Sequence, residues 1–284
     1  MKNLVPVNVS HIAMYRALVK KKYKTKEKAS LLLIDAAIAD RYTEFENAIK
    51  LNIIHNLSEN KKLQADEGAL RSCYSISTVG LKNILEGITK AQPTRQLERC
   101  PYCGTTLPKT HDHYLPAKEF PELAVHGLNL VPCCSSCNES KGDRWISGKK
   151  RIFIHYYSDE IPSEIFLSVD LVPSPNEQTL GAIFKIIKPV SGVITNWDLI
   201  ESHFSRLKLL DRYSELVNDE IAEAVDVCVD HLSEGGVSAS KFARRIGIRM
   251  GDTFGVNHWR AVLYAALSNH PVFEKMIYLK LEHR

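Results

Sequence analysis

Apolar residues recur every three or four positions over much of the first and last thirds of the chain. The clearest example begins at Ile34 and continues through Ile38, Tyr42, Phe45, Ile49 and Ile53, with charged residues between them. This spacing places the apolar side chains along one side of a helix. The same pattern predicts a helix over residues 81–91, helical structure from Trp197, and a final helical region over 238–281 beyond the break at Gly235 and Gly236.

Shorter runs after position 150 have a different pattern. Residues 151–157, 165–172 and 182–188 alternate between apolar and polar side chains and are rich in β-branched residues, which is typical of strands. Prolines separate these runs. We therefore predict an α+β chain in three regions: a helical N-terminal region over 1–95, a cysteine-rich region over 96–150, and a mostly helical α+β region with a few short strands over 151–284.

The composition excludes several classes of protein. The 284 residues are 44% hydrophobic and 25% charged, which is typical of a globular protein with a well-filled core. No window approaches the roughly 18 unbroken apolar residues of a membrane helix. Residues 1–10 lack the apolar core of a secretion signal, so we expect a cytoplasmic protein without membrane association. A net charge of +4 permits binding to a polyanion without establishing it.

The cysteines give the first chemical indication. Five of the seven lie between positions 100 and 137, and four of these form the pairs Cys100-Pro-Tyr-Cys103 and Cys134-Ser-Ser-Cys137. Two C-x-x-C pairs can supply the four sulfur ligands of a tetrahedral, structural zinc site. Cys133 could replace Cys134, although a C-x-x-x-C spacing suits a zinc knuckle less well. Buried cysteines without a metal are the alternative interpretation.

Polar residues suited to phosphate chemistry lie around the second cysteine pair. The segment Thr110-His111-Asp112-His113 precedes it, and Asn138 follows Cys137 directly. Oxygen donors from Asp112 and Asn138 suit a hard ion such as Mg²⁺. His113 alternates with Asp112 along a predicted strand, so it would face the other way and be free to accept a proton. Alternatively, Asp112 caps a turn and Asn138 caps the following helix.

These residues together resemble the HNH endonuclease family, also called the His-Me finger or ββα-metal family. The resemblance covers residues 100–143 and carries asparagine, at Asn138, in the last metal position, which makes it the HNN variant. It implies a ββα-metal finger braced by two zinc knuckles within a mainly helical chain. The segment from Asp112 to Asp143 also looks like HNH proteins of bacterial antiviral defence loci, which implies that the chain acts as the effector of such a system.

The resemblance also implies roles for individual residues. His113 would be the general base that activates water, and Asp112 and Asn138 would hold one Mg²⁺ or Mn²⁺. Asn129 would pin the loop that orients His113. Lys141 and Arg144 would contact the flanking phosphates of the nucleic acid.

The expected partner is therefore DNA, with RNA as an open alternative. A companion ATPase or another regulatory protein, and a homo-oligomer, are further expected partners. The competing interpretation is a non-catalytic, zinc-supported module that binds nucleic acid or protein. Such a module does not require Asp112, His113 and Asn138 together, so their joint presence favours the endonuclease.

Overall fold

The structure, a computed structural model, describes residues 1–23, 25–74, 78–190 and 194–283. Helices and three small two-stranded antiparallel sheets make up the regular elements of these residues, so the expected α+β class is confirmed. The chain divides into two compact units. The N-terminal unit comprises Asn3–Tyr102 and Thr106–Glu160, and the C-terminal unit comprises Met1–Lys2, Cys103–Thr105 and Ile161–Arg284.

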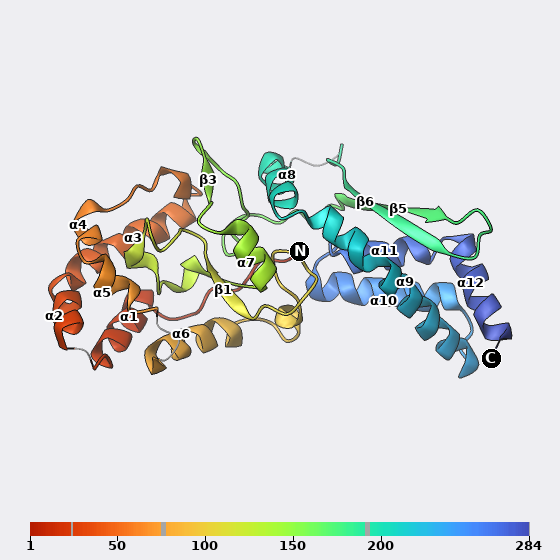
Figure 1. Ribbon diagram of the computed structural model, residues 1–284, viewed down its shortest axis with the longest axis horizontal. Coiled ribbons are helices and arrows are strands. Elements are labelled where there is room, and N and C mark those ends of the chain that lie inside the picture. Colours follow the sequence, from red (N-terminus) through yellow and green to blue (C-terminus); the bar gives the residue numbers. More distant parts are fainter. Residues whose placement is uncertain (24, 75–77, 191–193, 284) are drawn as a thin grey trace. The chain divides into compact units, whose positions relative to one another are not determined.

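The N-terminal unit begins with helices, as the apolar spacing predicts. They are α1 (His11–Lys20), α2 (Thr25–Leu33), α3 (Asp35–Lys50), α4 (Lys61–Gln64), α5 (Glu67–Arg71) and α6 (Val79–Lys90) (Figure 1). Ile38, Tyr42 and Phe45 of the α3 stripe are almost completely buried. The Ser10 hydroxyl accepts a hydrogen bond from Ala13 N–H and caps α1, and Thr78 caps α6 in the same way.

A short hairpin and a helix follow in the same unit. Strand β1 (Thr110–His113) pairs antiparallel with β2 (Leu130–Cys133), and α7 (Ser135–Lys141) begins directly after the second strand. The connection between the strands contains two 3₁₀ turns, Pro121–Leu123 and Gly127–Asn129. Gly142, with φ +53°, ends α7 in a backbone conformation that favours glycine. This order of strand, strand and helix places the polar residues described below.

The strand predicted over 151–157 is wrong. Only Lys150–Arg151 (β4) pairs, with Ile146–Ser147 (β3), and the following residues form no ladder within the described part of the chain. Phe153, His155 and Tyr156 are all completely buried. The apolar content of this run therefore reflects burial of an irregular segment, which periodicity alone cannot distinguish from a strand.

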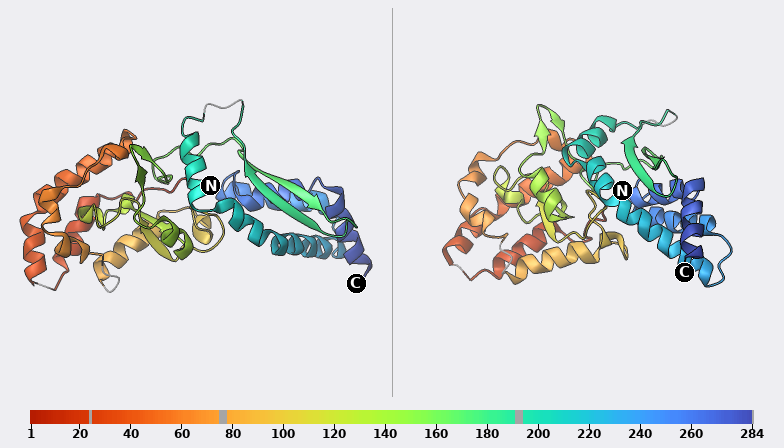
Figure 2. Two further views of the ribbon diagram at one scale, coloured as in Figure 1. Left: turned by 45° about the horizontal axis from the view of Figure 1, so that its top comes forward. Right: turned by 45° about the vertical axis from the view of Figure 1, so that its right-hand side comes forward.

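The C-terminal unit contains the strands predicted around 165–172 and 182–188, and both are confirmed. β5 (Leu167–Pro173) and β6 (Leu180–Ile186) form a hairpin that pairs Leu167 with Ile186 and Pro173 with Leu180. The hairpin packs on helices α9 and α11 (Figure 2). The helices of this unit are α8 (Trp197–Arg206), α9 (Leu209–Ser233), α10 (Ala239–Phe254), α11 (Trp259–Leu267) and α12 (Pro271–Glu282).

The boundary predicted between residues 95 and 96 falls inside the N-terminal unit. Hydrogen bonds join segments far apart in sequence there: Leu4 N–H donates to the Tyr156 carbonyl at 2.8 Å, and the Gln96 side chain donates to the Asn3 carbonyl at 2.7 Å. The helices and the β1–β2 hairpin are thus parts of one unit. Among the described residues, no helix combines the length and apolar character required to cross a bilayer.

Candidate active site

Four cysteine sulfurs form a cluster suited to a metal ion. Those of Cys100, Cys103, Cys134 and Cys137 all lie within 4.8 Å of one another, and all four residues are buried. Around a zinc ion with Zn–S bonds of 2.3 Å, tetrahedral sulfurs would be roughly 3.8 Å apart, so small adjustments suffice. The Cys134 backbone N–H donates to Cys100 Sγ at 3.3 Å, a contact that favours a thiolate. The predicted ligand set is therefore brought together and fits zinc.

Cys133 lies outside this cluster. Its side chain is buried next to the Thr110 hydroxyl, at 3.4 Å. Burial raises the pKa of its thiol to about 12, so it remains a protonated, weakly polar group at neutral pH. Cys134, as the C-x-x-C spacing predicted, and not Cys133, is therefore the fourth member of the sulfur cluster.

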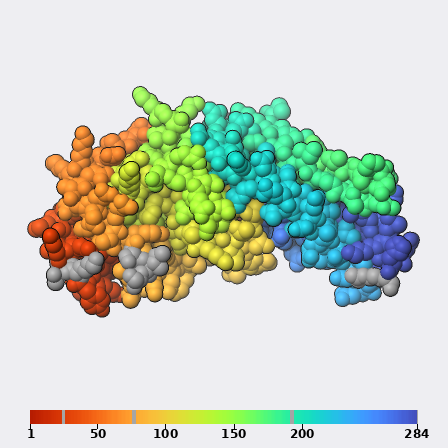
Figure 3. Space-filling view, in the orientation of Figure 1, coloured from red at the N-terminus to blue at the C-terminus, as the bar shows by residue number. Residues whose placement is uncertain are grey.

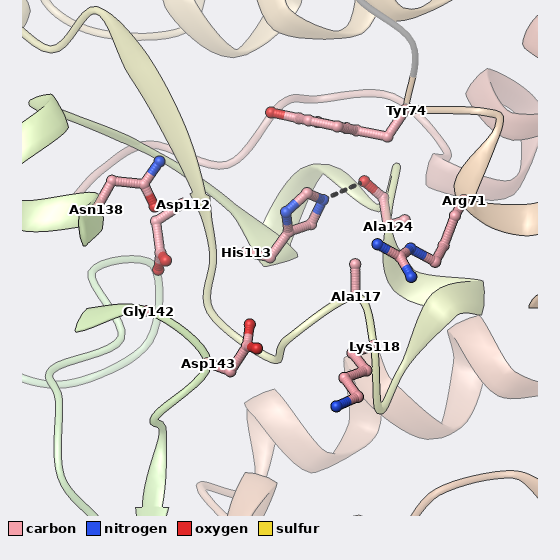
Figure 4. A pocket seen from close by; sticks show the side chains of 10 residues that line it. All are labelled: Arg71, Tyr74, Asp112, His113, Ala117, Lys118, Ala124, Asn138, Gly142 and Asp143. Atoms are coloured by element: carbon pink, nitrogen blue, oxygen red, sulfur yellow. Dashed lines mark hydrogen bonds between the residues drawn. The ribbon is translucent and has the colours of Figure 1, made fainter. Parts of the chain in front are cut away.

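Asp112, His113 and Asn138 line one cavity of about 390 Å³ (Figure 4). Asp112 and His113 are neighbours on β1, which led to the prediction that they face opposite ways. His113 is the last residue of the strand, and the chain turns away there, so both side chains reach the same cavity. Asn138 reaches it from α7. The three residues on which the sequence prediction depends thus share one space.

His113 is fixed by a hydrogen bond to the backbone. Its Nε2 lies 2.9 Å from the Ala124 carbonyl oxygen, which can only accept, so Nε2 carries the proton. Nδ1 therefore holds the free lone pair, and it points into the cavity (Figure 4) without a hydrogen-bond partner among the described residues. Burial lowers the pKa of the ring below its ordinary value, which keeps His113 neutral at pH 7. The Tyr74 ring packs edge-on against it, with 4.3 Å between ring centres.

Asp112 is buried and doubly hydrogen-bonded, with only 2% of its surface exposed. Its Oδ2 accepts from the Tyr102 hydroxyl at 2.8 Å, and its Oδ1 accepts from the Lys141 ammonium at 3.0 Å. Each carboxylate oxygen has a second lone pair, so two sites remain on the group. Asp112 does not simply cap a turn, because both of its partners are side chains from other segments.

The phosphate-contacting role predicted for Lys141 is wrong for this structure. The side chain is completely buried, and its ammonium binds Asp112 and the His113 carbonyl instead of facing solvent. Arg144 is exposed, but its guanidinium hydrogen-bonds the Ser140 and Lys141 carbonyls at the end of α7. Sequence reveals a positive charge at position 141 but not its depth below the surface, which the helix register determines.

Asn129 makes the backbone hydrogen bonds predicted for it. Its Oδ1 accepts from Leu115 N–H at 2.8 Å, and its Nδ2 donates to the Leu115 and Leu123 carbonyls at 3.0 and 3.1 Å. Leu123 precedes Ala124, whose carbonyl holds His113. Asn129 therefore ties down both ends of the loop that carries the acceptor for His113.

Asn138 does not cap α7, because the N-cap residue is Cys134. Its Nδ2 donates to the Thr110 hydroxyl at 3.3 Å, which leaves the amide oxygen available. The cavity also contains residues that the sequence analysis missed: Asp143, Arg71, Tyr74 and Lys118. Asp143 is within the motif region and could have been proposed as a carboxylate donor. Arg71 and Tyr74 are about forty residues upstream, and no local pattern connects them to the site.

A second polar cluster lies elsewhere in the N-terminal unit. Donor atoms of His11, Glu46 and His126 are within 4.8 Å of one another, and a separate cavity of about 920 Å³ is lined by His11 and Glu46. His126 Nδ1 accepts from Leu128 N–H at 3.2 Å, so its Nε2 carries the proton that faces Glu46 at 3.3 Å. His126 and Glu46 are therefore hydrogen-bonded to each other, whereas His11 contacts the His126 ring, with 4.2 Å between ring centres.

Comparison with known proteins finds a relative in a bacteriophage. The chain is similar to protein ea31 of Escherichia phage lambda. The two are 31% identical over 132 residues, which are 45% of this chain and 44% of the phage protein. The chain thus matches less than half of that relative's length. No protein-family model and no solved structure matches the chain.

Proposed function

We propose that the protein is a metal-dependent endonuclease of the HNH type that hydrolyses phosphodiester bonds in DNA. One observation carries the proposal. A neutral imidazole, held by the backbone through Nε2, directs Nδ1 into a cavity that also contains oxygen donors from Asp112, Asn138 and Asp143. A general base beside hard-metal ligands is the arrangement that phosphodiester hydrolysis requires.

His113 would take a proton from the attacking water through Nδ1. The Ala124 carbonyl holds the ring in the required tautomer and becomes a better partner as the ring gains positive charge. Because burial lowers the pKa of His113, the ring is neutral and ready to accept a proton at pH 7. Asn129 would act through the loop, since it fixes Leu123 beside the carbonyl that orients the base.

The donor set fits one hard divalent ion. Asp112 retains lone pairs on both oxygens, the Asn138 amide oxygen is available, and Asp143 is an exposed carboxylate on the cavity wall. These residues would hold Mg²⁺ or Mn²⁺, which would neutralise charge on the phosphate and the departing oxygen. The four-cysteine cluster supplies no open coordination position, so zinc in it would be structural.

Positive side chains on the cavity wall support a phosphate as substrate. Arg71 and Lys118 both line the cavity and are exposed to solvent. Arg71 pairs with Glu67 at 2.8 Å, whereas Lys118 has no ion-pair partner among the described residues. We assign the phosphate contacts first predicted for Lys141 to these two residues. A role in antiviral defence, with a companion ATPase, rests on the family resemblance alone.

Plasmid cleavage by matched histidine variants tests the proposal. Purified protein is incubated with supercoiled plasmid, with single-stranded DNA and with RNA, in Mg²⁺, Mn²⁺ or EDTA. His113→Ala should lower the cleavage rate about 10²- to 10⁴-fold, the usual contribution of a general base. His111→Ala is the control, because His111 lies two residues away on β1 and does not line the cavity.

Zinc content and circular dichroism establish that both variants are folded. Cleavage of RNA but not DNA would change the substrate class. Binding of DNA without cleavage under any metal would favour the non-catalytic module. Equal cleavage by His113→Ala and the wild type would reject His113 as the base.

A further inference from the structure

We propose that Lys141 is an internal counter-cation for Asp112 that keeps the cavity poor in divalent metal until a phosphodiester enters. Metal and nucleic acid would then bind cooperatively. The inference rests on the proposed function, since it concerns the same cavity and the same metal. It follows from the position of the Lys141 ammonium, which occupies one side of the carboxylate that the metal would use.

The ammonium has little freedom to leave. Its three donors meet three acceptors: Asp112 Oδ1 at 3.0 Å, the His113 carbonyl at 2.9 Å and the Gly142 carbonyl at 3.4 Å. The side chain is completely buried, and the ammonium lies 5.8 and 5.9 Å from the ring centres of Tyr114 and Phe153. Rotating it away would leave Asp112 as a buried charge without its partner, which is strongly unfavourable.

The charges around the cavity make a lone divalent cation a poor occupant. Asp112 and Asp143 are negative and Lys118 and Lys141 are positive, while Glu67 partly offsets the positive charge of Arg71. A metal on Asp112 would share that carboxylate with the ammonium, and repulsion between cations is strong where water is scarce. A phosphodiester brings one negative charge and further oxygen ligands. Each ligand therefore improves the site for the other, which is a positive coupling between metal and nucleic acid.

This arrangement would limit metal binding until nucleic acid enters the cavity. Without nucleic acid, Lys141 satisfies Asp112 and the metal-binding oxygens are only partly available. With a phosphate in the cavity, its negative charge and its oxygen atoms would favour binding of the metal beside Asp112. Lys141 touches neither water nor phosphate in this scheme, so it is a positioning residue that sets when the metal binds.

Manganese binding measured by electron paramagnetic resonance tests the inference. Zinc-loaded protein carrying His113→Ala, which should slow cutting, is titrated with Mn²⁺ with and without a duplex oligonucleotide. Lys141→Met is then added to this background. We expect Lys141→Met to bind Mn²⁺ about tenfold more tightly without DNA, and the improvement caused by DNA to shrink, within the usual range of coupling between sites.

Lys149→Met is the matched control. Lys149 is exposed on the β3–β4 hairpin, which projects from the surface (Figure 3). The variant removes the same charge without any contact with Asp112, so its manganese affinity should equal that of the parent. A purely structural role for Lys141 predicts the opposite sign, because a displaced Asp112 would bind Mn²⁺ more weakly.

The outcomes separate the two proposals. Weaker or unchanged Mn²⁺ binding by folded Lys141→Met would overturn the counter-cation role, whether or not the wild type cuts DNA. If Lys141→Met fails to fold, the parent titration decides, because the absence of any gain in Mn²⁺ affinity with DNA overturns the coupling. A wild type that shows this coupling but cuts no nucleic acid would reject the endonuclease and leave the counter-cation role intact.

Discussion

The two compact units bury different kinds of side chain. In the described residues, the N-terminal unit buries most of the charged and polar groups, among them Asp112, Lys141, Asn129 and His155. The C-terminal unit is filled mainly by apolar and aromatic groups, such as Phe184 packed edge-on against Tyr213, which stacks on Trp259 with 5.8 Å between ring centres. A buried polar group is costly unless it has a hydrogen-bond partner, whereas apolar groups need only close packing.

This difference predicts that the two units respond differently to substitution. The N-terminal unit holds a connected set of hydrogen bonds, so removal of one member leaves another unpaired and costs more than its own contact. In the aromatic core of the C-terminal unit, the loss of stability should follow the volume removed. The same substitution made in both units therefore distinguishes the two kinds of core.

The largest expected contrast is between two buried cysteines. Cys137→Ser in the four-cysteine cluster should abolish zinc binding and destabilise the protein by several kcal/mol, since structural zinc contributes about 10–16 kcal/mol of binding free energy in small domains. Cys228→Ser, equally buried in α9, should cost only about 1–3 kcal/mol for an added polar group. Zinc analysis and thermal unfolding measure both effects. Full zinc content in Cys137→Ser would contradict the cluster as a metal site.

Acid should loosen the N-terminal unit first. Burial lowers the pKa of His11, His111 and His155 from 6.5 to about 4. Between these values the unfolded chain binds protons that the folded unit excludes, so stability is complete above pH 6.5 and declines as the pH falls toward 4. The loss is on the order of 2–3 kcal/mol for each histidine.

Hydrogen exchange followed by mass spectrometry, corrected for the intrinsic effect of pH, resolves this loss in each unit. Zinc content is measured in the same samples, because protonation of the cysteines would imitate the histidine effect. Constant protection of the N-terminal unit from pH 7 to pH 4.5 would disprove the expectation.

A smaller contrast involves two buried asparagines with similar contacts. Asn129 bonds Leu115 and Leu123, while Asn257 accepts from the N–H groups of Phe166 and Leu167 at 2.8 and 3.0 Å. Each substitution by alanine should cost about 1–3 kcal/mol, the range for leaving a buried backbone group unpaired.

Only Asn129→Ala should also slow cleavage, on the order of a hundredfold if the base moves by about 1 Å. Denaturant unfolding and plasmid nicking measure the two quantities side by side. If Asn257→Ala slows nicking as much as Asn129→Ala, then Asn129 has no special connection to His113.

The sequence predicted the parts of this molecule that local spacing determines. The C-x-x-C pairs identified the four sulfurs, and the apolar stripe from Ile34 identified α3, because both depend on residues a few positions apart. The strands β5 and β6 were also predicted, although not their pairing, since a half-exposed strand keeps its alternation. Residues 152–157 were predicted wrongly, because a buried segment lacks the alternation of apolar and polar residues that identifies a strand.

The candidate site was predicted only in part, for a similar reason. Asp112, His113 and Asn138 lie close to the cysteines in sequence, and the motif names them together. Burial of Lys141 depends on which face of α7 packs against β1, which no local residue pattern expresses. Arg71 and Tyr74 reach the cavity through the packing of helices far upstream.

The position of Tyr74 also limits how far the chain can be shortened. Its ring lies against His113 on one side, and it belongs to the segment anchored by Leu70 and Cys73, both buried. A shortened protein that began at residue 96 would keep every zinc and oxygen ligand, yet it would lack this wall and expose the imidazole to bulk water. The ring would then lose the desolvation that depresses its proton affinity. The proposed activity should consequently require more of the chain than its motif.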